Sequence, residues 1–186
     1  MSALNWHKLA ETGKKRFEQS DEKERWEAAL LSFVGTPYRW GSEVPEGADC
    51  SGAVCFALAA ATGLARRMTA ESLYRTVFTV QGPAIRGISA LFFISRKEKH
   101  EGGIIKPAGG IHHVAGIVAE GIAVNMSEPE GRLREISDLK RVYDRIGYDM
   151  VARGLSRQAW ERFAYPVQFA KEFDPEFYPY FEGEPA

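Results

Sequence analysis

The feature that most constrains this chain is the stretch 35–63, GTPYRWGSEVPEGADCSGAVCFALAAATG, where a loop gives way abruptly to an apolar helix. Glycines and prolines spaced along 35–49 mark that part as a loop. The alanine-rich run 51–62, closed by Gly63, predicts a buried helix. Cys50, one of only two cysteines, lies at the junction of loop and helix. This placement makes Cys50 the first candidate for chemistry.

A cysteine at a helix start is well placed to act as a nucleophile. Unpaired backbone N–H groups and the positive end of the helix dipole stabilise an anion there. We therefore expect the Cys50 thiolate, and the oxyanion of an acyl-transfer reaction, to be stabilised at this point. Gly52 is expected to let a substrate approach closely. Packing alone is the alternative for Cys50, and it is the favoured interpretation for Cys55, which lies deeper in the helix.

Two of the four histidines fit the role of a base for such a nucleophile. His7 and His100 lie in charged segments and are predicted to be solvated. His112 and His113 open a predicted strand, which can aim their rings rigidly. We favour His113 and keep His112 as the alternative, because a slip of one residue in register would exchange the two faces of the strand.

Asn125 is the candidate for the group that orients the base. It lies twelve residues after His113, across a predicted tight turn at Glu120-Gly121. Equal parity on two paired strands would bring Asn125 back beside His113 on the same face. The alternative is that Asn125 is an ordinary polar residue at the end of a strand.

The remaining pattern places helices first and strands afterwards, which is typical of an α+β fold with an antiparallel sheet and helices on one side. Ser20 is the predicted N-cap of the second helix. Besides 51–62, helices are expected at about 4–18, 20–34, 69–76 and 156–164. Strands are expected at 88–95, 112–120, 122–127 and 147–155, with 96–110 as a surface loop.

Composition narrows the class of protein. The 186 residues suit one domain with short terminal additions. The net charge of −1 gives no general attraction to nucleic acid. No run reaches the roughly 18 apolar residues of a membrane span, and the charged N-terminus lacks the apolar core of a signal sequence. Two cysteines are too few for a disulfide framework and match no zinc pattern, so both are expected to be reduced, with no metal site.

Two motifs resemble those of the NlpC-type cell-wall peptidases, a papain-like family of cysteine hydrolases. The family shows G-x-P-Y-x-W-G-G, then D-C-S-G and an apolar helix, and residues 35–54 read GTPYRWGSEVPEGADCSGAV. Its second motif is H-V-G-I-Y-L-G-x-G with a polar residue twelve positions after the histidine. Residues 113–125 read HVAGIVAEGIAVN. The resemblance covers roughly 21–154 and implies a papain-like fold.

The resemblance also implies roles for particular residues. Its catalytic triad would be Cys50 as nucleophile, His113 holding the thiolate as an ion pair, and Asn125 orienting the imidazole. Substrate contacts would come from three further residues, Tyr38, Asp49 and Ser51. The implied reaction is hydrolysis of peptidoglycan stem peptides, most commonly at the bond between γ-D-glutamate and a diamino acid, with no metal or organic cofactor.

The chain departs from the family pattern at several points, which affects the cleft walls more than the chemistry. Ser42 replaces the second glycine of the W-G-G run, and Ile117 replaces the usual tyrosine. The acidic residue of the family strand is Ser89 or Ala90 here, and the segment before His113 is long. Trp40 is expected to pack rather than to contact substrate.

Several alternatives stay open. A second enzymatic hypothesis is an amidase at the muramoyl–L-alanine bond, or an acyl transfer. A wall-degrading part of a phage tail or secretion assembly, and an inactive wall-binding module, are two more. Without a visible signal sequence, we expect either cytoplasmic recycling of wall peptides or delivery by a phage or secretion system. We divide the chain into an N-terminal helical extension (1–20), a peptidase domain (21–164) and an extended tail (165–186), which packs on the domain or docks a partner.

Overall fold

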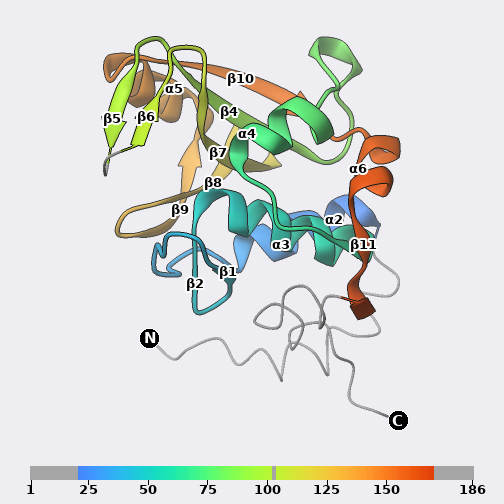
Figure 1. The fold of residues 1–186 in the computed structure, drawn as a ribbon. Coiled ribbons are helices and arrows are strands. Elements are labelled where there is room, and N and C mark those ends of the chain that lie inside the picture. Colours follow the sequence, from blue (N-terminus) through green and yellow to red (C-terminus); the bar gives the residue numbers. More distant parts are fainter. Residues whose placement is uncertain (1–20, 102–103, 170–186) are drawn as a thin grey trace.

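A five-stranded antiparallel sheet forms the centre of the computed structural model, which describes residues 21–101 and 104–169 (Figure 1). The strand order is β10-β4-β7-β8-β9. The strands are β4 (Ser89–Ser95), β7 (Ile111–Ala119), β8 (Ile122–Ser127), β9 (Glu130–Glu135) and β10 (Tyr148–Gly154). All four predicted strands are confirmed, and β9 was not predicted. The tight turn at Glu120-Gly121 is also present, with Gly121 at φ 74°.

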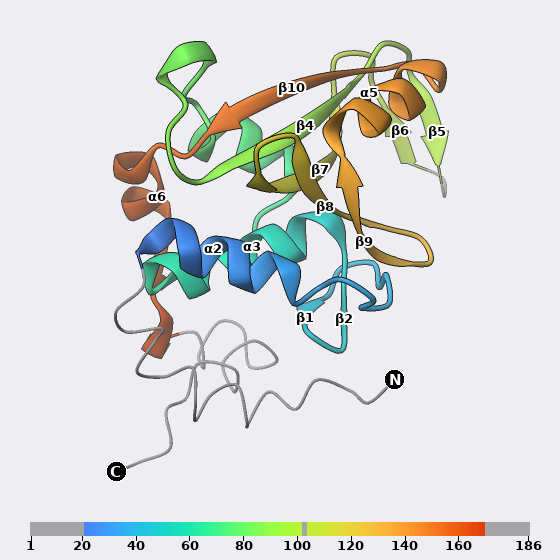
Figure 2. The ribbon, with the colours of Figure 1, turned by 180° about the vertical axis from the view of Figure 1, so that it is seen from behind.

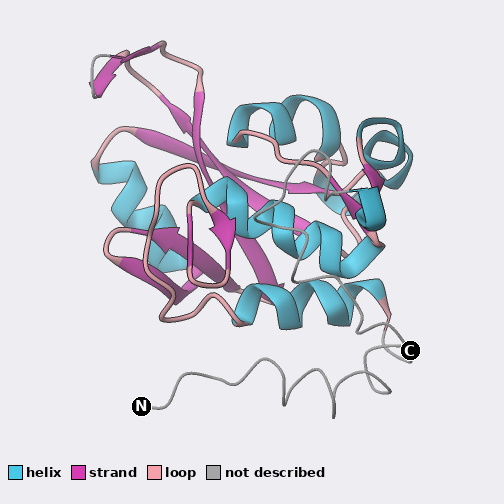
Figure 3. Cartoon of the chain, turned by 60° about the horizontal axis from the view of Figure 1, so that its bottom comes forward, coloured by secondary structure: helices cyan, strands magenta, loops and turns pink. Residues whose placement is uncertain are grey.

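Helices α2 (Glu22–Leu31) and α3 (Cys50–Thr62) lie side by side against one face of the sheet (Figures 1 and 3). Their apolar side chains join those of the sheet in the larger of two hydrophobic clusters. The N-cap of α2 is Asp21, which forms a capping box with Glu24. Ser20, the predicted N-cap, lies outside the described residues, as does the predicted helix at 4–18.

Helix α3 follows the prediction closely. It begins at Cys50, one residue before the predicted start, and ends before Gly63, whose φ of 71° is the left-handed conformation that glycine favours at a helix end. All but two of its thirteen residues are buried, which explains its apolar composition on every side. The loop before it contains a short hairpin of β1 (Glu43–Val44) and β2 (Gly47–Ala48).

The opposite face of the sheet is covered by α5 (Ile136–Arg145), which was not predicted (Figure 2). The prediction of helices on one side only is therefore wrong. Leu139 from α5 is buried in a second, smaller cluster with residues of the central strands, among them Phe93 and Ala123. The sheet thus separates two packed layers of different size.

The remaining elements are short and lie around this core. The segment 96–110, predicted as a surface loop, contains a hairpin of β5 (Lys99–Glu101) and β6 (Ile104–Lys106). The helix predicted at 69–76 is α4 (Ala70–Ser72) continued by a π-helical turn (Leu73–Val77), and the one at 156–164 is α6 (Arg157–Phe163). A 3-10 turn, Gly82–Ala84, precedes β4. None of the helices in the described ranges has the length and hydropathy needed to cross a membrane.

Part of the predicted C-terminal tail is described, and it packs on the domain. Strand β11 (Tyr165–Pro166) pairs with β3 (Leu64–Ala65) just after the end of α3, and a 3-10 turn, Val167–Phe169, follows. The Val167 N–H also donates to the Gly63 carbonyl. The rest of the tail, 170–186, lies outside the described residues, so its role stays a prediction.

Candidate active site

Cys50 occupies the first position of α3, where the loop crosses closely over the helix start. The Asp49 side chain caps the helix by accepting from the Gly52 N–H at 2.7 Å. A Cβ at Gly52 would come within 2.2 Å of the Ser42 carbonyl oxygen. The prediction that Gly52 leaves space for a substrate is therefore wrong, because the backbone of the preceding loop occupies that space.

Asp49 is the centre of a buried polar network that fixes this junction. One carboxylate oxygen also accepts from the Ser51 hydroxyl at 3.0 Å, and the other accepts from the Gly41 N–H at 2.9 Å and from Arg67 at 2.6 Å. Arg67 donates to the Ser51 hydroxyl as well, at 2.9 Å. Asp49 and Ser51 are 5% and 6% exposed. These contacts hold the loop and helix together. The contact of Asp49 and Ser51 with substrate stays a prediction.

The surroundings of the Cys50 thiol oppose its ionisation. Burial raises its pKa to about 11, and the Asp49 carboxylate adds to the rise. Hydrogen bonds from the backbone of Val114 and Ser51 lower the pKa, as does Arg67, but they do not compensate. This rise in pKa is opposite to the shift expected from the helix start alone. Removal of water from the thiolate costs more free energy than the helix end contributes to its stabilisation.

A β-bulge separates the two candidate histidines. On β4, Phe93 pairs with His113 while the next residue, Ile94, pairs with Ile111, so His112 is the extra residue of the bulge. His112 lies edge-on to Tyr148, with 3.4 Å between its Nδ1 and the phenol oxygen. The bulge thus directs His112 toward Tyr148, and His113 is the histidine in contact with Asn125.

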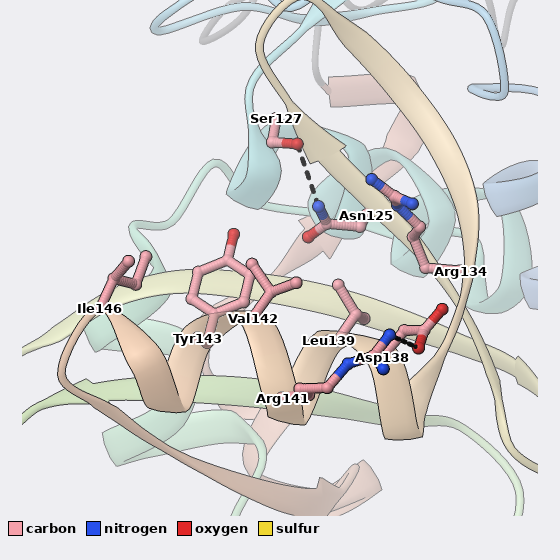
Figure 4. A pocket seen from close by; sticks show the side chains of 9 residues that line it. All are labelled: Asn125, Ser127, Arg134, Asp138, Leu139, Arg141, Val142, Tyr143 and Ile146. Atoms are coloured by element: carbon pink, nitrogen blue, oxygen red, sulfur yellow. Dashed lines mark hydrogen bonds and ion pairs between the residues drawn. The ribbon is translucent and has the colours of Figure 1, made fainter.

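The contact between His113 and Asn125 fixes the protonation of the imidazole. His113 Nε2 lies 2.6 Å from Asn125 Oδ1. Since a carbonyl oxygen can only accept, Nε2 carries the proton, and Nδ1 of the neutral ring keeps its lone pair. The Asn125 amide nitrogen donates to the Ser127 hydroxyl at 3.0 Å (Figure 4), which supports this orientation of the amide. The predicted meeting of the two residues across the hairpin is confirmed.

Cys50 lies next to the strand that carries this histidine. One of the two backbone hydrogen bonds that its sulfur receives comes from Val114, the residue directly after His113. The charge of Cys50 also acts on Tyr143, whose ring stacks on His113. The helix start on one layer and strand β7 therefore converge on the thiol. The structure brings together the nucleophile, base and orienting residue that the sequence suggested, although their catalytic roles stay a prediction.

Tyr143 on α5 is a site residue that the sequence analysis missed. Its ring stacks on His113, with centroids 5.5 Å apart and an angle of 13° between the planes, and it also packs against Phe93. Burial raises its pKa to about 12, while a hydrogen bond from Asn125 lowers it. Tyr143 thus contacts both ring and amide of the His113–Asn125 pair. Apolar residues at 136, 139, 142, 143 and 146 carry the helical spacing that could have predicted α5.

Tyr38 approaches the nucleophile from the loop side. Its N–H donates to the Pro129 carbonyl, and it forms an isolated β-bridge with Ala48, so the backbone is held at both sides. Burial, followed by the charge of Cys50, raises the pKa of Tyr38. The phenol therefore stays protonated and can donate a hydrogen bond.

Trp40, which was expected to pack, is instead 73% exposed.

Cys55 and His100 agree with their predicted settings. Cys55 is 1% exposed in the core, and both cysteines are free thiols. His100 is exposed and lies 2.9 Å from Glu98, whereas His7 lies outside the described residues. Within 21–101 and 104–169, no three or more His, Cys, Asp or Glu side chains are grouped so that they could hold a metal ion.

Residues 35–146, more than half of the chain, match the NlpC/P60 family. The chain belongs to the NlpC/P60 family. The resemblance inferred from the two motifs is confirmed, and membership of NlpC/P60 supports a cell-wall peptidase and hydrolase.

Solved NlpC/P60 structures share the fold. The NlpC/p60 domain of the peptidoglycan hydrolase SagA is 20% identical, with 71% of this chain and 97% of that one covered and a TM-score of 0.50. An NLP/P60 family protein similar to lipoprotein from Staphylococcus aureus is 20% identical, with 72% and 41% covered and a TM-score of 0.53. NlpC1 from Trichomonas vaginalis is 15% identical, with 74% and 46% covered and a TM-score of 0.50.

These similarities establish the predicted fold class, an α+β, papain-like arrangement of helices and antiparallel sheet. The chain spans less than half of the Staphylococcus aureus and Trichomonas vaginalis chains. At 15–20% identity, the likeness concerns the fold alone.

Proposed function

We propose that this chain is a cysteine endopeptidase that hydrolyses peptidoglycan stem peptides at the bond between γ-D-glutamate and a diamino acid. The observation that carries the proposal is the 2.6 Å contact between His113 Nε2 and Asn125 Oδ1, on a strand whose Val114 backbone contacts the sulfur of a cysteine at a helix start. This contact leaves Nδ1 of His113 as the ring nitrogen that can accept the thiol proton. Membership of NlpC/P60 supports the substrate class.

In the proposed first step, the Cys50 sulfur attacks the peptide carbonyl carbon while its proton passes to His113 Nδ1. Since burial raises the pKa of the thiol to about 11, the proton leaves as attack occurs rather than before substrate binds. The Tyr38 hydroxyl and the N–H groups at the start of α3 are candidates to stabilise the oxyanion. Asn125 keeps the imidazole oriented throughout.

The second half of the reaction restores the enzyme. The C–N bond breaks as His113 protonates the leaving amine, which leaves a thioester on Cys50. Water then attacks the thioester, with His113 as base, and releases a carboxylate and the free thiol. No metal or organic cofactor takes part in this sequence.

Digestion of defined muropeptides, read by mass spectrometry, tests the proposal. A new amino end on the diamino acid supports the endopeptidase, whereas a new amino end on L-alanine identifies the amidase instead. Cys50→Ala should lower the rate by about 10⁴-fold or more. The matched control, Cys55→Ala, removes the buried core thiol and should keep most activity. Absence of cleavage by the wild type would favour the inactive wall-binding module.

The biological setting is a separate part of the proposal. Recycling of wall peptides in the cytoplasm, and delivery to the wall by a phage or secretion system, both accommodate a stem-peptide hydrolase. The aromatic tail beyond position 169 is the candidate to dock a partner in the second setting. Cell fractionation of the natural host, followed by immunodetection, distinguishes the two.

A further inference from the structure

A groove of about 270 Å³ lies beside Asn125, between strands β8 and β9 on one side and α5 on the other (Figure 4). Asn125 and Tyr143, which belong to the candidate active site, form part of its wall. Leu139 lines it from α5, and Arg134 lines it from β9. The groove therefore begins at Asn125, the hydrogen-bond partner of His113, and extends away from this pair.

Positive charge dominates the groove because one arginine lacks an acidic partner. Arg141, on α5, forms an ion pair with Asp138 at 2.6 Å. Arg134 forms no ion pair within the described ranges 21–101 and 104–169. It pairs in register with Ala123, a member of the α5-side cluster, which places Arg134 on the face of the sheet that bears the groove. In Figure 4, Arg134 and Tyr143 both point toward Asn125.

We propose that this groove is a carboxylate-binding subsite for the peptide substrate, with Arg134 as its anchor. The inference rests on the proposed function. A planar guanidinium matches a carboxylate with two parallel hydrogen bonds, and the Tyr143 hydroxyl can add a third donor. The positive charge of Arg134 acts on Tyr143 to lower its pKa, so the two side chains already interact electrostatically.

Of the carboxylates on the proposed substrate, the two nearest the scissile bond are the candidates for this site. A γ-linked D-glutamate keeps its α-carboxylate free, and the diamino acid carries a carboxylate on the other side of the scissile bond. Both share the chemistry that Arg134 would recognise. An amide at either position removes the negative charge but keeps nearly the same shape, which makes amidated peptides suitable probes.

The test compares three synthetic peptides: L-alanyl-γ-D-glutamyl-diaminopimelate, its α-amide at D-glutamate, and its amide at the diaminopimelate carboxylate next to the scissile bond. Values of kcat/KM are measured for the wild type, Arg134→Gln and Arg132→Gln. Arg132 is the matched control, because it lies two residues away on the same strand and is paired with Glu130 at 3.5 Å.

We expect amidation of one of the two carboxylates to lower kcat/KM of the wild type by about fivefold or more, a modest effect because Arg134 is exposed. In Arg134→Gln, the ratio between acid and amide peptides should fall close to one, while Arg132→Gln keeps the wild-type ratio. The amide that is discriminated against identifies which carboxylate enters the groove.

Three outcomes overturn the subsite. If the wild type cleaves all three peptides at equal rates, or if Arg134→Gln keeps the full discrimination, Arg134 binds neither carboxylate next to the scissile bond, and the peptidase proposal stands. If the wild type cleaves none of the peptides, the proposed function fails and the subsite fails with it. The two failures are therefore distinguishable.

Discussion

The two faces of the central sheet differ in what they bury. The face toward α2 and α3 packs large apolar side chains, including Trp26, Phe33 and Phe92, in the larger cluster. The face toward α5 has the smaller cluster and, beside it, the polar pair of His113 and Asn125 with Tyr143 against it. One face supplies most of the apolar packing, and the other holds the candidate base in position.

The nucleophile belongs to the first layer and the base to the second. Cys50 starts the buried helix α3, whereas His113 is held from the side of α5. The two groups meet because strand β7 contacts both layers, with the Val114 N–H reaching the Cys50 sulfur. We infer that changes on the α3 face mainly affect stability, and that changes on the α5 face mainly affect activity.

A matched pair of core substitutions tests this division and should give the largest change in stability. Leu58 on α3 is 0% exposed and Leu139 on α5 is 4% exposed. Leu58→Ala should lower the free energy of unfolding by about 4–5 kcal/mol, and Leu139→Ala by about 2–3 kcal/mol, because the smaller layer can relax around the cavity. Urea unfolding provides both values.

For activity, we expect the opposite order of effects in the same two variants. At a temperature where both are folded, Leu58→Ala should keep kcat close to the wild-type value, while Leu139→Ala lowers it because α5 holds Tyr143 on His113. A larger loss of kcat in Leu58→Ala than in Leu139→Ala would contradict the division between the two faces.

Removal of the Asn125 amide should have the next largest effect, which is on kcat. Asn125→Ala deletes the acceptor of the His113 Nε2–H and should lower kcat by about a hundredfold. Asn125→Asp keeps an acceptor oxygen and should recover most of that loss. Steady-state kinetics on the muropeptide substrate measures both. If Asn125→Ala keeps wild-type kcat, Asn125 does not orient the base.

Substitutions of Tyr143 should lower kcat less than Asn125→Ala, because Tyr143 acts through His113 and Asn125. Tyr143→Leu removes the stacked ring and should lower kcat by about tenfold. Tyr143→Phe keeps the ring, loses the hydrogen bond with Asn125 and should lower kcat by about threefold. A positioning role also predicts a shifted pH profile of kcat in Tyr143→Leu. An unchanged profile with a reduced Tm would indicate a purely structural role.

The pH dependence of alkylation tests the resting state of the thiol. Burial raises the pKa of Cys50 to about 11, so the thiolate fraction, and with it the rate of labelling by iodoacetamide, should increase through pH 7–10 without a plateau. Cys55, with a pKa raised to about 12 and 1% exposure, should react more slowly still. Peptide mapping by mass spectrometry follows both. A plateau below pH 8 would show that an ion pair with His113 outweighs burial.

The sequence predicted the parts of the site that depend on short-range pattern. The start of α3 followed from composition on either side of Cys50, and the meeting of His113 with Asn125 followed from parity across one hairpin. Both are local rules, so neither required knowledge of the tertiary fold.

The features that sequence did not predict depend on contacts between distant segments. The pKa of Cys50 rises because tertiary packing removes water from it, and Gly52 is required by a loop that crosses the helix start. Helix α5 is different: its apolar spacing was present in the sequence, and Tyr143 could have been found with it.

The most direct test of the account is to trap the acyl-enzyme. Wild-type protein is mixed with the stem tripeptide, quenched in acid within the first turnovers, and digested for peptide mapping by mass spectrometry. We expect an L-alanyl-γ-D-glutamyl thioester on the peptide that contains Cys50, and its absence in His113→Ala. Turnover of the substrate with an acyl group on another residue, or with Cys50→Ala as active as the wild type, would contradict it.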